Sequence, residues 1–194
     1  YLLFNEGYYS SNRNTVLQKD LCLEAMRLTH MLTENESTNH PGVNALLSLM
    51  CFHASRFDAR TNKAGVLILY DEQDIKLLDK QLIKKGEYYL NLSAKGDEIT
   101  KYHIEAAIAY WHTGERDSSE KWEKILSLYN RLLMVEYSPI AALNRTYALA
   151  KVYGNETAII EAEKLHLTNS HLYHILLGEF YTDLDKLRPL ITLI

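Results

Sequence analysis

Long stretches of this 194-residue sequence carry apolar residues at intervals of three and four, and only three prolines and eight glycines interrupt them. This spacing places apolar side chains on one face of an α-helix, whereas a half-buried strand alternates apolar and polar residues. Proline disrupts a helix interior, so its scarcity leaves room for long helices. The sequence therefore predicts an all-α fold.

Two helices are predicted in the first quarter of the chain. An apolar stripe within residues 16–32 predicts the first helix, which Asn14 or Thr15 can cap. Pro41 suits the first turn of a second, strongly apolar helix that continues to Phe57 and ends in the polar residues that follow. The stripe of the first helix consists of Val16, Leu17, Leu21, Cys22, Ala25, Leu28 and Leu32.

An extended segment and a third helix are predicted next. Residues 64–70 contain Val66-Leu67-Ile68-Leu69 after a glycine, which favours a short extended or hairpin segment. Asp71 can cap a helix that runs to about Leu92. A turn at residues 95–97 then marks a boundary between an N-terminal helical subdomain, residues 1–96, and a second part, residues 97–194.

The second part contains a motif that recurs at a fixed interval. Residues 177–181 (LGEFY) fit the core of a tetratricopeptide (TPR) first helix, and similar segments occur at 143–147 and 106–110. Amphipathic segments at 122–132 and 158–165 follow two of them. This pattern predicts two to three degenerate TPR-like helix pairs that form a surface for protein binding. An irregular helical bundle is the alternative.

Turn chemistry supports these helix boundaries. Asp117 and Glu120 have the spacing of a capping box, Ser138 precedes a proline, and Gly154 suits a helix end. Pro189 falls where a further helix would extend, so the last repeat is expected to be incomplete.

Charge and composition favour some classes of protein over others. A net charge of −4 argues against a module that grips nucleic-acid phosphates. Cys22 and Cys51 lie in apolar helical runs, as inert thiols do in a reducing compartment. No apolar run approaches the length of a membrane span and no cationic leader precedes one, so we expect a cytoplasmic protein. The opening residues 1–8 suggest an internal segment of a longer chain.

Five blocks of this sequence resemble, in order and spacing, the C-terminal extension of a subgroup of extracytoplasmic-function (ECF) RNA polymerase sigma factors. The blocks are residues 1–8 (YLLFNEGY), 49–60 (LMCFHASRFDAR), 71–74 (DEQD), 102–109 (YHIEAAIA) with His112, and 138–145 (SPIAALNR). The blocks are spread from residue 1 to residue 145, and five blocks in register are far more specific than any one of them.

The resemblance implies a bacterial parent protein in which two sigma regions, which bind DNA and polymerase, precede Tyr1. It implies a TPR-like extension that takes the place of a separate anti-sigma factor. We therefore expect a regulatory protein-interaction domain that modulates transcription initiation through its own sigma regions or RNA polymerase core. DNA would be contacted only through the sigma regions, and the resemblance implies no enzyme activity, no cofactor and no membrane partner.

A group of polar residues within these blocks is the predicted site. His53, Arg56 and Arg60 are three and four residues apart, so they share one face of the predicted second helix. Cations in such a row need carboxylate partners, and the candidates are Glu6, Asp71, Glu72, Asp74 and Glu105. The full set of predicted interaction or polar-network residues is Asn5, Glu6, Tyr8, His53, Arg56, Arg60, Asp71, Gln73, Asp74, Glu105, His112, Asn144 and Arg145.

Three interpretations of this set stay open. A salt-bridge network could fix the first three helices against the repeats, because buried charge must be paired. The same residues could instead form a groove for an acidic or peptide element of the sigma regions. The third interpretation, and the alternative function, is a small-molecule sensor or degenerate enzyme with a polar pocket around Glu6, His53, Arg56 and Glu105.

The sequence favours neither a metal site nor a catalytic one. His171 and His174 could share a helix face, yet no cysteine pair or carboxylate accompanies them at ligand spacing. His103 and His112 face different directions and are expected to cap helices or bond locally. Cys51 and His53 do not form a thiol–imidazole pair by spacing alone, and no nucleophile elbow or phosphate-binding glycine loop occurs.

Overall fold

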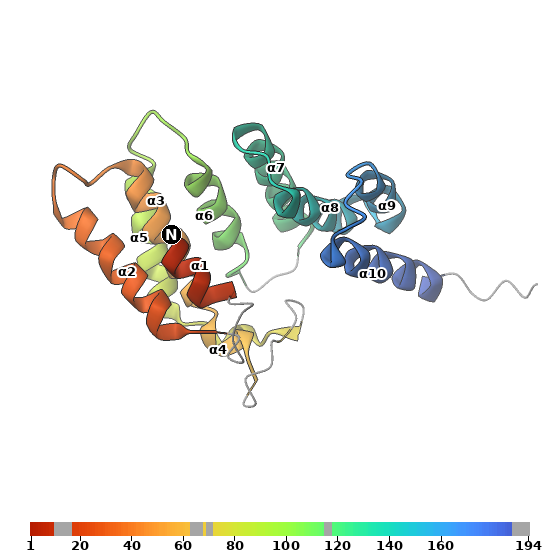
Figure 1. Cartoon of the computed structure of the whole chain (residues 1–194), viewed down its shortest axis with the longest axis horizontal. Coiled ribbons are helices and arrows are strands. Elements are labelled where there is room, and N and C mark those ends of the chain that lie inside the picture. The colour runs from red at the N-terminus through yellow and green to blue at the C-terminus, as the bar shows by residue number, and fades with distance from the viewer. Residues whose placement is uncertain (10–16, 63–67, 69–71, 115–117, 188–194) are drawn as a thin grey trace, which may run out of the picture. The chain divides into compact units, whose positions relative to one another are not determined.

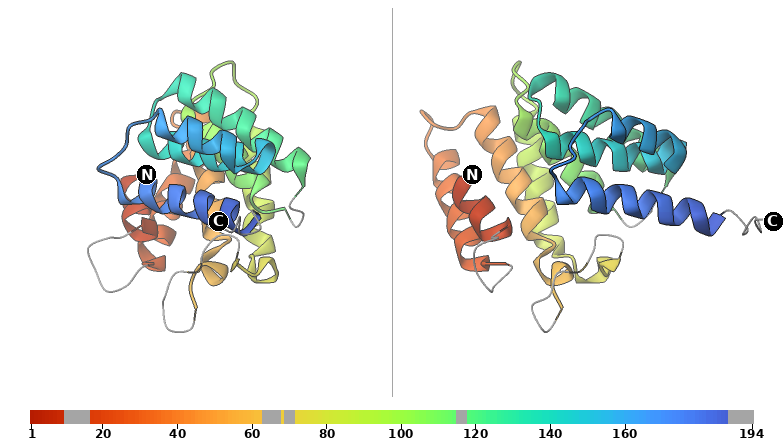
Figure 2. Two further views of the ribbon diagram at one scale, coloured as in Figure 1. Left: turned by 90° about the vertical axis from the view of Figure 1, so that its right-hand side faces the viewer. Right: turned by 45° about the vertical axis from the view of Figure 1, so that its right-hand side comes forward.

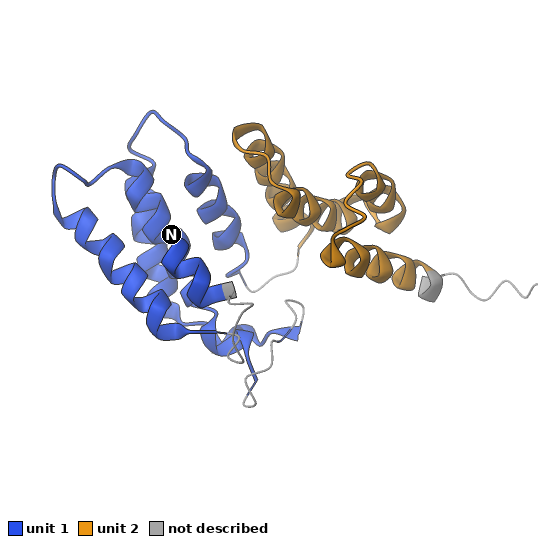
Figure 3. Ribbon diagram, in the orientation of Figure 1, with its two compact units in different colours: residues 1–115 blue, residues 116–194 orange. Residues whose placement is uncertain are grey.

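The computed structural model describes residues 1–9, 17–62, 68, 72–114 and 118–187, and the regular structure of these residues is helical. The chain divides into two compact units, residues 1–115 and residues 116–194 (Figures 1 and 3). The prediction of an all-α fold with TPR-like helix pairs is therefore confirmed. We describe each unit by itself.

The first unit is built around one helix, α3, which packs against α2, α5 and α6. The elements of this unit are α1 (Leu2–Tyr9), α2 (Lys19–Glu34), α3 (Pro41–Ala54), α4 (Phe57–Arg60), the 3₁₀ helix η2 (Ile75–Leu77), α5 (Lys80–Ser93) and α6 (Lys101–Trp111). Pro41 occupies the first turn of α3, as predicted, where its missing N–H costs nothing. Because α3 contacts three neighbours, it is buried on almost every side. Figure 2 shows α2, α3 and α5 side by side.

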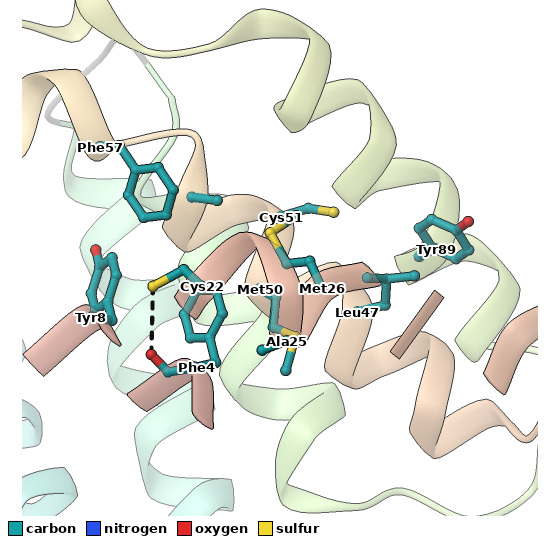
Figure 4. Close-up of a cluster of buried hydrophobic side chains, with 11 residues drawn as sticks. Phe4, Tyr8, Cys22, Ala25, Met26, Leu47, Met50, Cys51, Phe57 and Tyr89 are labelled. Atoms are coloured by element: carbon teal, nitrogen blue, oxygen red, sulfur yellow. Dashed lines mark hydrogen bonds between the residues drawn. The ribbon is translucent and has the colours of Figure 1, made fainter. Parts of the chain in front are cut away.

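The core of the first unit combines aromatic, aliphatic and sulfur side chains from α1, α2, α3, α4 and α5 (Figure 4). Cys22 and Cys51 lie in it as free thiols, and the Cys22 Sγ donates to the Phe4 carbonyl oxygen at 3.6 Å. Burial raises the pKa of Cys22 to about 11 and that of Cys51 to about 12. Both thiols are therefore protonated packing groups, as the sequence indicates.

α5 approaches α3 closely because residue 86 is a glycine. The Ser48 hydroxyl of α3 donates to the Gly86 carbonyl oxygen at 2.8 Å. A Cβ atom at position 86 would lie 2.6 Å from Cε1 of the Phe52 ring, well inside normal contact distance. The absence of a side chain at this position therefore sets the spacing of the two helices.

The predicted buried face of α2 is partly wrong. Leu28 and Leu32 are 45% and 44% exposed, whereas Met26 and Thr29 are buried with Cys22 and Ala25. These four buried positions follow the i, i+3, i+4, i+7 pattern of one helix face. α2 begins at Lys19 without a side-chain cap, and the predicted caps Asn14 and Thr15 lie outside the described residues.

The second predicted helix is also shorter than the sequence suggests. α3 ends at Ala54, a turn follows at residues 55 and 56, and α4 is a separate helix. The turn is held by the Ser55 hydroxyl, which donates to the Phe52 carbonyl oxygen at 2.7 Å, and by the Asp79 N–H, which donates to the Ser55 carbonyl oxygen at 2.8 Å. His53, Arg56 and Arg60 therefore do not share one continuous helix.

The predicted cap of α5 differs as well. Asp79 caps α5 by accepting from the backbone N–H groups of Gln81 and Leu82, and Asp74 caps η2 in the same manner. Asp71, which the sequence assigns to this role, lies outside the described residues. So does the predicted extended segment 64–70, apart from Ile68.

The second unit is a series of four helices in which each packs on the next. They are α7 (Ser119–Val135), α8 (Pro139–Tyr153), α9 (Asn155–Glu163) and α10 (His171–Leu187). Ser118 and Ser138 cap α7 and α8 by accepting from backbone N–H groups, and Gly154 ends α8 with a φ of 86°. The predictions for Ser138 and Gly154 are confirmed. Asp117, the predicted cap of α7, lies outside the described residues, as does Pro189.

The division between units lies later in the chain than the sequence suggests. The sequence places the boundary after residue 96, whereas the packing places it after residue 115. The difference is α6, which packs mainly against α3 and also contacts α5. The segment 106–110, which the sequence assigns to the repeats, therefore belongs to the core of the first unit, where Ala106 and Ala109 are buried beside Leu49 and Phe52.

Candidate functional site

The predicted site residues fall into both units. Most lie in the first: Asn5, Glu6 and Tyr8 in α1, His53 in α3, Arg56 in the turn, Arg60 in α4, Gln73 and Asp74 before η2, Glu105 in α6, and His112 at its end. Asn144 and Arg145 lie in α8 of the second unit. The first-unit set provides the candidate site, which we build from the side chains whose contacts are defined.

An imidazole lies against two aromatic rings at the centre of this site. The centroid of the His53 ring is 5.0 Å from that of Tyr8 and 6.3 Å from that of Phe4. Burial of the ring, together with the positive charges of Arg60 and Arg56, lowers the pKa of His53 to about 3. His53 is therefore neutral near pH 7. It packs as an aromatic group with polar edges and is not a cation in need of a carboxylate.

Arg60 also contacts Tyr8. Its guanidinium carbon is 4.0 Å from the centroid of the Tyr8 ring, which is a cation–π contact. Tyr8 is almost fully buried, so this contact ties the end of α4 to α1. A salt bridge also joins α2 to α4, because Lys19 Nζ is 2.6 Å from Asp58 Oδ1.

Arg56 joins the turn after α3 to the segment before η2. Its Nε donates to Gln73 Oε1 at 3.1 Å, and its Nη2 donates to the same oxygen. Gln73 Nε2 in turn donates to the carbonyl oxygen of Ile68 at 3.0 Å. The described hydrogen bonds of Arg56 thus go to an amide oxygen, whereas the sequence predicts a carboxylate.

The remaining first-unit candidates have different roles. Asp74 is exposed and serves as the cap of η2, and Glu6 is exposed on α1. Asn5 Oδ1 is buried, and within the described residues no donor reaches it. The structure therefore brings Tyr8, His53 and Arg60 together, with Arg56 and Gln73 beside them, and uses Asp74 elsewhere.

The second-unit candidate Arg145 joins three helices. Its Nε donates to Asn130 Oδ1 of α7 at 2.6 Å, and its Nη1 is 3.7 Å from Glu161 Oε2 of α9. Hydrogen bonding from Lys164 and the nearby Arg145 charge lower the pKa of Glu161. Asn144 is exposed next to it on α8. Arg145 is therefore a cross-link within the helix stack.

The histidines outside this cluster have local partners. The His103 ring completes a capping box with Thr100 at the start of α6, as the sequence predicts, and its Nε2 is 3.3 Å from the Ser93 carbonyl oxygen. His174 Nε2 is 2.8 Å from the carbonyl oxygen of Thr168. Over the described ranges, no group of three or more His, Cys, Asp or Glu residues has a geometry that could hold a metal ion. None of the described helices combines the length and apolar character needed to cross a bilayer.

One feature of the first unit is absent from the sequence-based set. A pocket of about 260 Å³ lies where α2 ends, α3 begins and α5 ends. Asn44 lines it and is 5% exposed. The signal for this site was an asparagine one turn into an otherwise apolar helix, which the periodicity of α3 assigns to the core.

In a comparison with known proteins, one family model matches the first part of the chain. Residues 1–94 match a family of unknown function (DUF6596). The match runs from α1 to the end of α5, so it contains His53, Arg56, Arg60 and the 260 Å³ pocket. No activity comes with this family.

The match to a curated relative extends over both units. An uncharacterized protein of Rhizobium meliloti (strain 1021) is 33% identical over 189 residues, which are 96% of this chain and 44% of the relative. The chain thus spans less than half of that protein. No solved structure matches the chain significantly.

Proposed function

We propose that this chain is a regulatory, protein-interaction module of an ECF-type RNA polymerase sigma factor. In this proposal it acts in the bacterial cytoplasm on the sigma regions of its own polypeptide or on RNA polymerase core, and so sets the rate of transcription initiation. DNA is bound by the sigma regions and not by this module, whose net charge is −4. The five-block resemblance supports the family assignment, and the longer Rhizobium meliloti relative is compatible with a module inside a larger protein.

The observation that carries the proposal is an exposed apolar surface in the second unit. Within seven residues at the bend between α7 and α8, four apolar side chains are at least half exposed: Met134, Val135, Tyr137 and Ile140, at 87%, 51%, 62% and 59%. Single exposed apolar residues are ordinary, but a contiguous group marks a surface that another protein covers. We name this group the α7–α8 bend surface.

The polar cluster supports binding by surface contact over chemistry in a pocket. His53 is neutral and packs against the Tyr8 and Phe4 rings, Arg60 lies on Tyr8, and Arg56 is bonded to Gln73. A sensor or degenerate enzyme built on His53 and Arg56 would need these groups to face a substrate. The contacts described for them, to aromatic rings and to an amide oxygen, join elements of the first unit to one another.

The test uses the α7–α8 bend surface and not the arginines. Charge reversal at Arg56 or Arg145 would break internal ties, so a loss of function would not distinguish binding from folding. We therefore choose the double variant Met134→Ser/Tyr137→Ser. The matched control is Leu172→Ser/Ile175→Ser, two residues of the same unit that are 45% and 62% exposed on α10.

Two measurements follow. This chain is used to capture separately expressed sigma regions or core polymerase at low and high salt, and promoter output is measured with the full-length parent. We expect the bend variant to lose capture and to change promoter output, and the control to behave as wild type. Wild-type behaviour of a folded bend variant would remove this surface from the mechanism. Failure of the unmodified chain to capture either partner at both salt concentrations would overturn the proposed function.

A further inference from the structure

One side of α2 is covered by α1 over only part of its length. The Gly7 carbonyl oxygen of α1 accepts from the Gln18 N–H at 2.8 Å, and the Phe4 carbonyl oxygen accepts from Cys22 Sγ at 3.6 Å. Residue numbers fall along α1 as they rise along α2, so the two helices are antiparallel. α1 has 8 residues and α2 has 16, and α2 continues beyond the N-terminal end of α1 (Figure 1).

Two leucines lie on this side of α2 beyond the start of α1. A Cβ atom at Gly7 would be 3.0 Å from Leu21 Cβ, so these two positions are level with each other. Leu28 and Leu32 follow Leu21 at intervals of seven and four residues, which keeps them on the same side of α2. Seven residues before Gly7, on the same side of α1, is the position immediately before Tyr1. A helix that continued α1 in this direction would therefore lie beside Leu28.

Leu28 and Leu32 belong to an exposed apolar surface with a polar border. They are 45% and 44% exposed, and Met31 beside them is 51% exposed. Arg27 lies along the border, where its Nε and Nη2 donate to the two carboxylate oxygens of Glu24 and its Nη1 donates to Met31 Sδ at 3.2 Å. An apolar group with a polar border marks a contact site. We name Leu28, Met31 and Leu32 the α2 apolar surface.

The N-terminal end of α1 is placed so that further helical turns would follow this surface. The Tyr1 carbonyl oxygen accepts from the Asn5 N–H at 3.0 Å, so the helical hydrogen bonds already include Tyr1. The Tyr1 ring stacks on Phe4 and meets Tyr102 edge to face, with centroids 6.5 Å and 5.4 Å away, which fixes this end of α1. One or two further turns before Tyr1, each about 5.4 Å long, would pass along the α2 apolar surface.

We propose that the segment immediately before Tyr1 in the parent protein covers the α2 apolar surface, as a helical extension of α1 with apolar side chains on its α2 side. The inference rests on one element of the proposed function, namely that sigma regions precede Tyr1. The Rhizobium meliloti relative is long enough for such a segment, since the match spans 44% of it. Because the segment is attached at Tyr1, its effective concentration at this surface exceeds that of a separate partner. The helix joins the sigma regions to the first unit without a flexible linker, so a reorientation of either part moves the other.

The experiment compares cysteine labelling in this chain and in the full-length parent. Leu28→Cys places a thiol on the α2 apolar surface, and maleimide labelling at residue 28 is followed by peptide mass spectrometry. The native thiols of Cys22 and Cys51 are buried, and burial raises the pKa of both, so they are labelled slowly. We expect Leu28→Cys to be labelled at least about tenfold more slowly in the parent, because a covered thiol reacts only when the segment opens.

The matched control is Leu23→Cys, which changes the same residue type on the same helix. Leu23 is 51% exposed, and its separation of five residues from Leu28 places it about 140° away around α2. We expect Leu23→Cys to be labelled at the same rate in this chain and in the parent. Both leucines are exposed, so neither substitution disturbs the core.

Three outcomes would overturn the inference. Equal labelling of Leu28→Cys in the two proteins would show that the preceding segment leaves the surface open. Equal protection of Leu23→Cys in the parent would show that the cover is not specific to this side of α2. Protection of Leu28→Cys in this chain alone, increasing with its concentration, would show that a second copy is the occupant. Labelling depends neither on promoter output nor on capture of a separate partner, so a failure of the α7–α8 bend surface in those assays leaves this result intact.

Discussion

Replacement of Gly86 by alanine tests whether the close contact of α5 with α3 organises the first unit. The added Cβ would lie 2.6 Å, 2.8 Å and 2.9 Å from three atoms of the Phe52 ring. That ring is 1% exposed and packs with Leu49, Ala106 and Ala109, so it has little room to move. Gly86 also accepts the Ser48 hydrogen bond, which holds the two backbones together.

Two opposing effects set the expected magnitude. Alanine in a helix interior is favoured over glycine by about 0.8–1.0 kcal/mol. Insertion of a methyl group into a well-packed core costs about 1–3 kcal/mol. We therefore expect Gly86→Ala to lower the free energy of unfolding of the first unit by up to about 2 kcal/mol, or roughly 8 °C in Tm for a unit of this size.

The matched control is Gly42→Ala in the first turn of α3. Its nearest neighbour would be Thr100 Cγ2 at 3.7 Å, an ordinary contact distance. This variant is expected to gain about 0.4–1 kcal/mol through the reduced entropy of the unfolded chain. Both variants are compared with wild type by urea unfolding followed by circular dichroism. If Gly86→Ala proves as stable as Gly42→Ala, the Phe52 ring can yield and the glycine does not set the helix spacing.

Three further predictions concern other features. Gly154 has a φ of 86°, so Gly154→Ala is expected to destabilise the second unit by about 1–3 kcal/mol in a urea titration. Gly178→Ala is the control, because a Cβ there meets no atom within 4 Å, and it is expected to be neutral or stabilising. The pKa of His53 is about 3 in the folded chain and 6.5 in the unfolded chain, so the unfolded state binds the proton first as the pH falls. The free energy of unfolding should thus decrease by up to about 1.4 kcal/mol per pH unit from pH 6.5 downward. His53→Leu should reduce this pH dependence, and the exposed His40→Gln serves as the control. An unchanged pH dependence in His53→Leu would contradict a neutral His53 imidazole in the folded chain. Arg145→Ala removes contacts to Asn130 and Glu161 and should lower the free energy of unfolding of the second unit by about 1 kcal/mol, measured by thermal unfolding. An unchanged free energy of unfolding would show that these contacts are not stabilising.

Helix boundaries with a local chemical signal could be predicted from the sequence, and buried faces could not always be. Ser138 followed by proline and Gly154 act through their own side chain or backbone, so the pattern alone identifies them. α2 has apolar residues on two faces, and its packing on α1 and α3 decides that Met26 is buried while Leu28 is 45% exposed. The sequence alone does not indicate which of the two apolar faces of α2 is buried.

In the candidate site, too, some features could be predicted from the sequence and others could not. The sequence gathered Tyr8, His53 and Arg60 through their membership of shared blocks, and the structure brings their side chains together. The predicted reason was different, because the sequence analysis assumed that one continuous helix carries His53, Arg56 and Arg60. The helix instead breaks at Ser55, where a bond from Asp79 holds the turn, and Arg56 reaches Gln73. Such tertiary bonds join residues that are far apart in sequence and leave no local pattern.

α6 belongs to the first unit of the fold but lies outside the residues that match the family. The matched residues end at the close of α5, yet α6 covers the side of α3 that carries Leu49 and Phe52. Without α6, those two side chains, each 1% exposed in the whole chain, would lose the cover of Ala106 and Ala109. The family segment therefore lacks part of the core of the unit that contains it. Since α6 also carries one of the five resemblance blocks, that block lies against the Phe52 ring, which in turn contacts α5 at Gly86.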